Sequence, residues 1–85
     1  MEVMVMTMTK ERVVEVIVDE ARATVDRIAE VDRRPLPAAV RTEMLLRLRD
    51  IARREASSLR DCTEPQLREA IERYIRKQVA DLGPL

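Results

Sequence analysis

The sequence predicts a small all-α protein built as a bundle of three helices. Three observations carry this prediction: apolar residues recur every three or four positions, glycine occurs only once, and two proline-containing breaks divide the chain. Alanine, leucine, glutamate and arginine, which all favour helix, are abundant. We expect helices at about residues 10–33, 37–59 and 64–82, within a single domain that covers residues 10–85.

Composition limits how much core the chain can build by itself. Of its 85 residues, 46% are hydrophobic and 38% are charged, and Tyr74 is the only aromatic residue. The core must therefore be aliphatic. A core of this size leaves one chain close to the balance between burial and conformational entropy. We therefore expect a homo-oligomer, most simply a dimer, that buries the aliphatic helix faces more fully.

The first nine residues have two interpretations. Valine or threonine alternates with methionine from Val3 to Met8, which is the pattern of a short β-strand over residues 2–8. Such a strand would lie at an edge and would need a partner, for example the same strand of a second subunit. The alternative is that residues 1–9 form a leader without regular structure. The segment lacks the basic and long apolar regions of a signal peptide.

The first helix is predicted by the period of its apolar residues, although its β-branched residues would also suit a strand. Thr9 is the expected N-cap, and the helix should end near Arg33 because Pro35 disfavours helical backbone in the residue before it. Acidic residues occupy the opposite face. The expected apolar face consists of Val14, Ile17, Ala21, Thr24, Ile28 and Val31, widened by Val13, Val18 and Val25.

The second helix concentrates positive charge beside an aliphatic face. Pro37 suits its first turn, and the short connection before it predicts an antiparallel hairpin or a sharp corner with the first helix. Two charges, Arg41 and Glu55, fall within the apolar stripe by helical spacing. Burying either one without a partner is costly, so we expect Arg41 of one chain to approach Glu55 of another across a two-fold axis. The alternative for Arg41 is an extended side chain that reaches solvent. On this interpretation the second helix is the central packing helix of the oligomer.

The third helix has the clearest start and stop signals. Thr63 and Gln66 have the spacing of a capping box, Pro65 suits a first turn, and Gly83 is a natural residue to end the helix. Its apolar face consists of Leu67, Ala70, Ile71, Tyr74, Ile75, Val79 and Leu82.

Charge is distributed unevenly although the formal net charge is zero. Residues 1–32 contain eight acids and four bases, residues 33–60 contain three acids and eight bases, and residues 61–85 contain five acids and four bases. A neutral chain has no overall field that attracts nucleic acid, so opposite charges within or between chains are the simpler partners. We therefore expect a non-enzymatic interaction module, an accessory or regulatory subunit. Its expected interface is Val14, Ile17, Ala21, Ile28, Met44, Leu48, Ile51, Arg41 and Glu55.

Two other function classes stay open. The basic segment at residues 37–60 also suits a DNA-binding regulator, in which an anion or the phosphate backbone would contact Arg47, Arg49, Arg53 and Arg54. A small all-helical enzyme with an arginine-lined site is the second alternative. The chain has no histidine and one cysteine, which excludes the usual zinc sites and triads that need histidine. We expect no cofactor or metal.

Residue usage also gives expectations about the setting of the protein. Fourteen arginines against two lysines are typical of a GC-rich genome, and we expect a bacterial or phage-like source. No segment approaches the roughly 20 apolar residues that span a bilayer. The single Cys62 excludes an internal disulfide, so we expect a cytoplasmic protein in which this thiol has a structural role.

Overall fold

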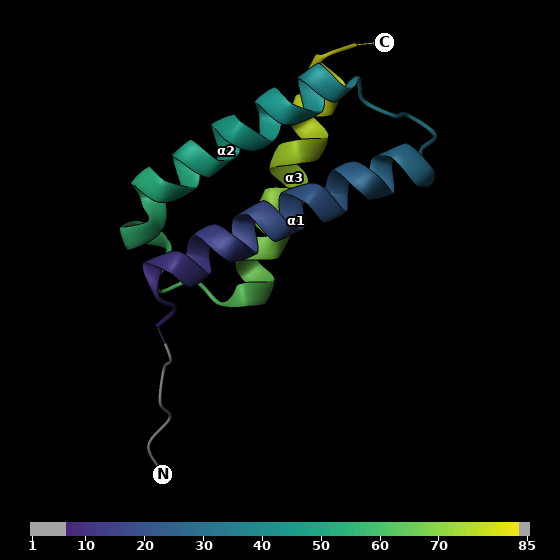
Figure 1. The fold of residues 1–85 in the computed structure, drawn as a ribbon. Helices are drawn as coiled ribbons and strands as arrows, with labels where there is room; N and C mark the ends of the chain where they lie inside the picture. Colours follow the sequence, from purple (N-terminus) through teal and green to yellow (C-terminus); the bar gives the residue numbers. More distant parts are fainter. Residues whose placement is uncertain (1–6, 84–85) are drawn as a thin grey trace.

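The computed structural model describes residues 7–83 and contains three helices. They are α1 (Lys10–Glu30), α2 (Ala38–Leu59) and α3 (Glu64–Asp81) (Figure 1). The predicted all-α bundle is confirmed. The strand predicted at 2–8 lies mostly outside the described residues. Its described part, Thr7 and Met8, is irregular, and the Met8 amide donates to the Arg60 carbonyl at 3.1 Å.

Helix α1 begins where the sequence predicts and ends about three residues earlier. The Thr9 hydroxyl accepts a hydrogen bond from the Arg12 amide at 3.1 Å, as expected of an N-cap. The helix ends at Glu30 because Arg33 takes the left-handed conformation, with a φ of 53°. The Arg34 amide then donates back to the Ile28 carbonyl at 3.2 Å. Pro35 disfavours helical backbone only in the residue directly before it, so this proline does not determine where the turn lies.

Helix α2 returns antiparallel to α1, and the two form a long hairpin (Figure 1). Pro37 is the N-cap residue of α2, one position before the first-turn site that the sequence suggests. No side chain caps this end of the helix.

Helix α3 confirms the predicted capping box. The Gln66 amide donates to the Thr63 hydroxyl at 3.3 Å, and the Thr63 amide donates to the Gln66 side-chain oxygen at 3.1 Å. Gly83 has a φ of 71°, which is the left-handed conformation that glycine adopts without strain. In Figure 1 the helix crosses α1 and ends beside the start of α2.

The central helix of the bundle is α1. It packs against both other helices, whereas α2 and α3 make little contact with each other. Within one chain the central position therefore belongs to α1, and the expected central place of α2 in an oligomer stays a prediction. The physical reason is the width of the buried face: on α1 it covers about half of the helix circumference, whereas on α2 it is a narrow stripe of Leu48, Ala52 and Ala56. The fully buried residues of α1 are Val13, Val16, Ile17, Glu20, Ala21, Thr24, Val25 and Ile28.

Candidate interaction surfaces

A buried polar group on α1 anchors one edge of the α1–α3 contact. Glu20 is 7% exposed, and Arg27 donates to its carboxylate at 3.2 Å and to the Thr24 hydroxyl at 3.1 Å. Arg27 also lies 3.8 Å from the Glu72 carboxylate of α3. Glu20 was not among the residues that the sequence pattern predicted to be buried. The signal was present, because Glu20 lies three residues after Ile17 and four before Thr24, on the buried side of the helix.

Two ion-pair networks join α3 to α1 and to the segment that follows α1. In the first, Glu64 accepts from Arg68 at 2.9 Å and from Arg12 at 3.1 Å, and Arg68 also donates to Asp19 at 2.9 Å. Hydrogen bonds from Arg68 and then from Arg12 lower the pKa of Glu64 below its ordinary value. The hydrogen bond to Asp19, followed by the one to Glu64, raises the pKa of Arg68.

The second network lies nearer the C-terminal end of α1. Arg76 donates to Glu72 at 3.2 Å and to Asp32 at 3.0 Å, and these bonds, that to Glu72 first, raise the pKa of Arg76. Between α1 and α2, by contrast, the described residues contain one ion pair, from Arg41 to Asp26 at 2.9 Å. The acids of α1 are therefore paired mainly within α1 and with α3, and most arginines of α2 are left without them.

The residues predicted to form an interface divide into two groups. Ile17, Ala21, Ile28 and Leu48 lie in the core of the single chain, each less than 5% exposed, so a partner cannot contact them while the chain keeps this fold. The others keep partly exposed side chains. This second group is Val14, Met44 and Ile51.

The two charges predicted to lie in the apolar stripe of α2 behave differently from the expectation. Arg41 is half-buried and pairs with Asp26 of its own chain, and Glu55 is exposed. Within one chain Glu55 lies at the exposed surface of α2, and the expected contact of Arg41 with Glu55 of a second copy stays a prediction. Because α3 packs on α1 and scarcely touches α2, no helix covers the side of α2 that carries Glu55.

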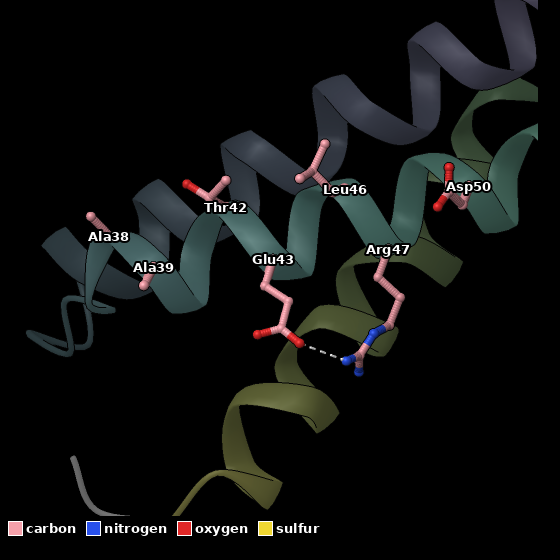
Figure 2. Close-up of a pocket in the computed structure, with 7 residues that line it drawn as sticks. All are labelled: Ala38, Ala39, Thr42, Glu43, Leu46, Arg47 and Asp50. Carbon is pink, nitrogen blue, oxygen red and sulfur yellow. Dashed lines mark hydrogen bonds and ion pairs between the residues drawn. The ribbon is translucent and has the colours of Figure 1, made fainter.

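The four arginines of the anion-binding alternative do not converge. Arg47 donates to Glu43 at 3.0 Å on the side of α2 that faces α3 (Figure 2). Arg49, Arg53 and Arg54 have no carboxylate within ion-pair distance among residues 7–83. By helical spacing, Arg49 and Arg53 share one stripe of α2, and Arg54 lies on the other side with Arg47.

One candidate surface is the side of the α1–α2 hairpin on which Val14 lies, which we call the hairpin face. It contains two adjoining shallow hollows. Near the start of α1, Glu11 and Val14 lie beside Arg53 of α2, and one turn further along, Glu15 and Val18 lie beside Arg49. The remaining side chains that line the two hollows are Lys10, Asp19, Arg22 and Ala56.

Leu46 extends the hairpin face along α2. It is 57% exposed and lies on the same stripe as Thr42, Arg49 and Arg53, at spacings of three and four residues. In Figure 2, Thr42 and Leu46 point away from the side on which Glu43 and Arg47 lie. A third shallow hollow on this outer surface of α2 is lined by Ala38, Ala39, Thr42, Glu43, Leu46, Arg47 and Asp50.

A second candidate surface is the groove between the first half of α2 and the end of α3. Met44 and Tyr74 are half-buried there, and Leu82 is 41% exposed. Its volume, about 150 Å³, suits one or two side chains and is below the range of about 300–1,000 Å³ that holds small ligands. The sequence pattern does not predict this groove, because the groove depends on how α2 and α3 diverge. Its lining is Val40, Glu43, Met44, Arg47, Tyr74, Gln78 and Leu82.

The remaining expectations concern the single cysteine, metal binding and membrane-spanning segments. Cys62 is a free, half-buried thiol in the turn between α2 and α3. In the part of the chain that the structure describes, no group of three or more acidic or cysteine side chains is placed to hold a metal ion. None of the described helices combines the length and apolar character needed to cross a membrane.

Comparisons with known proteins add no relative: no protein family, curated protein or solved structure matches this chain.

Proposed function

We propose that this protein is a small non-enzymatic interaction module, an accessory or regulatory subunit that acts through helix-mediated oligomerisation. The favoured assembly is a homodimer in the cytoplasm. A protein partner that contributes a helix in place of the second copy is the heteromeric form of the same function.

The observation that supports this proposal is the incomplete cover of α2. This helix packs on α1 and has little contact with α3. Three of its residues are fully buried, whereas Val40, Met44 and Ile51 stay half-exposed and Leu46 is 57% exposed. When a partner covers exposed aliphatic surface, each Å² that is removed from water stabilises the complex by roughly 25 cal/mol. Because partly exposed apolar residues lie beside its buried stripe, α2 favours association with a partner.

Sedimentation velocity on the full chain tests the proposal. We expect a species of twice the chain mass that dissociates on dilution through the micromolar range. A single species of one chain mass at every concentration up to about 200 µM would contradict self-association, because stable dimers of small proteins have dissociation constants well below this value.

A DNA-binding regulator is the second candidate, and the unpaired arginines Arg49, Arg53 and Arg54 favour it. A helix that binds phosphates through several arginines loses affinity steeply as salt is raised. The test is binding to random duplex DNA in a salt titration, with a variant in which Arg47, Arg49, Arg53 and Arg54 are replaced by glutamine. Steep salt dependence that the variant loses would support DNA binding, and no binding at low salt would exclude it.

Against this candidate, Arg49 and Arg53 share their hollows with Glu11, Glu15 and Asp19. Carboxylates beside the arginines repel a phosphate backbone. No specific observation favours the arginine-lined enzyme site, because the two arginines that line the same hollow of the hairpin face, Arg22 and Arg49, lie among three carboxylates. We therefore propose no catalytic activity.

A further inference from the structure

We infer that the hairpin face binds a second copy of this chain about a two-fold axis parallel to α1 and α2, so that α1 of each copy lies on α2 of the other. This inference rests on the proposed function, since it requires that the chain associates with itself. It adds which surface is used and how the two copies are oriented.

Charge is divided between the two edges of this face. The edge contributed by α1 carries the acids Glu11, Glu15 and Asp19, with one base at each end, Lys10 and Arg22. The edge contributed by α2 carries the bases Arg49 and Arg53. Glu11, Arg49 and Arg53 have no ion-pair partner among the described residues, and Glu15 contacts only the exposed Arg12. Between Lys10 and Arg22, the face therefore presents an acidic row, Glu11 and Glu15, beside the basic row of α2, and most of these charges have no partner among the described residues.

The two rows are in register along the hairpin. Glu11 lines the same hollow as Arg53, and Glu15 lines the same hollow as Arg49. Because α1 and α2 run antiparallel, the next residue of each row lies one helical turn further along, in opposite sequence directions. Each acid thus has a base at its own level on the neighbouring helix.

This register distinguishes between the two ways in which a flat face can pack on its own copy. A two-fold axis in the plane of the face and perpendicular to the helices places α1 on α1, and therefore acid near acid. An axis parallel to the helices places α1 on α2 at the same level. The second arrangement brings Glu11 near the partner's Arg53 and Glu15 near the partner's Arg49, and symmetry repeats both pairs. Like-charge contact disfavours the first arrangement.

Apolar residues lie beside the charged rows and within them. Val14 lines both hollows and Val18 lines one, and both are half-buried in the single chain. Leu46 lies on the same stripe as Arg49, one turn nearer the connecting segment, and is the most exposed large hydrophobic residue of α2. A second copy would cover all three. Charged rows that flank an aliphatic centre are the usual arrangement between packed helices.

The size of the face suits a dimer of this kind. Helices of about 30 Å in length that lie side by side present a face of roughly 600 Å² in projection. Stable dimers bury about 800 Å² of accessible surface per partner, which is of the same order. The result is a four-helix arrangement in which stacked helices are antiparallel, with α3 of each copy on the outside.

The test uses two complementary charge reversals in the full chain. In one variant, Arg49→Glu and Arg53→Glu make both rows acidic, and in the other, Glu11→Arg and Glu15→Arg make both rows basic. We expect each variant alone to show a dimer dissociation constant raised about tenfold or more, because four exposed pairs turn from attraction to repulsion. An equimolar mixture should restore the dimer as a heterodimer. Arg54→Glu with Lys77→Glu, the same change of charge at exposed positions elsewhere, is the matched control and should dimerise normally.

Each outcome is decisive. A wild-type dimer that neither reversal weakens would overturn the hairpin-face interface and leave the proposed function intact, as would a mixture of weakened variants that fails to restore the dimer. Loss of the dimer on Leu82→Asp, in the α2–α3 groove, would assign the interface to that groove instead. A monomeric wild-type chain would refute the inference together with the proposed function. Restoration in the mixture also shows that the single variants fold, which circular dichroism checks independently.

Discussion

The Arg27 guanidinium lies 3.2 Å from the Glu20 carboxylate and supplies the cation that this buried acid needs. Glu20 is 7% exposed, whereas the Arg27 side chain is 45% exposed and reaches the Glu72 carboxylate of α3 at 3.8 Å. Arg27 therefore links the buried carboxylate of α1 to a carboxylate of α3 at the surface. A carboxylate this buried is tolerated because the arginine beside it offsets its loss of hydration.

Removal of Arg27 should destabilise the chain more than removal of an exposed arginine. Arg27→Met keeps much of the aliphatic stem and leaves Glu20 without its cation, and we expect a loss of about 1–3 kcal/mol in the free energy of unfolding. Denaturant unfolding at one fixed protein concentration measures the difference. Arg73→Met, which breaks the exposed pair with Glu69, is the matched control and should cost less than about 1 kcal/mol.

A second substitution separates the charge from the packing. If the cost of Arg27→Met comes from the unpaired carboxylate, adding Glu20→Leu should recover most of the loss, because an apolar side chain no longer needs the cation. A double variant as unstable as the single one would show that Arg27 acts through packing alone.

Thr63 should be the most sensitive polar position in the connecting segments. Thr63→Ala removes the acceptor of the Gln66 amide and half of the capping box, at a cost of about 1 kcal/mol in the free energy of unfolding. Ser57→Ala, at an exposed position inside α2, is the control and should have an effect within about 0.5 kcal/mol. Equal effects of the two substitutions in denaturant unfolding would argue against a contribution from the cap.

The central place of α1 can be tested with matched valines. Val16 of α1 is completely buried and Val40 of α2 is half-exposed. Val16→Ala should cost roughly 1–3 kcal/mol through lost burial and an unfilled cavity, and Val40→Ala should cost less than about 1 kcal/mol. Thermal unfolding gives the comparison directly. A larger loss from Val40→Ala would mean that α2, and not α1, carries the core.

Acid should weaken the α1–α3 contact through Glu64. Arg68 and Arg12 lower the pKa of this carboxyl in the folded chain. Because the folded pKa lies below the unfolded one, the stabilisation is complete above the unfolded value of about 4.3 and is lost as the pH falls through the folded value. Unfolding measured from about pH 6 downward should show this loss, and Glu64→Gln should reduce the slope of stability against pH below about pH 4.3. An unchanged acid slope in Glu64→Gln would contradict the role of this carboxyl.

The positions of the three helices could be predicted from the sequence, because the residues that begin and end a helix act locally. Thr9 and Thr63 cap helices because a hydroxyl before the first turn satisfies its free amides, whatever the rest of the chain does. Gly83 ends α3 because its φ of 71° is costly for other residues. The end of α1 was less well predicted, since the turn at Arg33 depends on how the connection meets α2.

The relative position of the helices was decided only by the tertiary structure. Periodicity identifies an apolar face but not which neighbour covers it, so the sequence did not indicate that α1 would pack against both other helices. For the same reason Glu20 is buried beside Arg27, Arg41 pairs with Asp26, and Glu55 is left exposed where α3 diverges. Capping and helical period act over one turn, which a sequence displays. Burial and charge pairing depend on residues up to 52 positions apart, such as Arg12 and Glu64, which only the packed chain brings together.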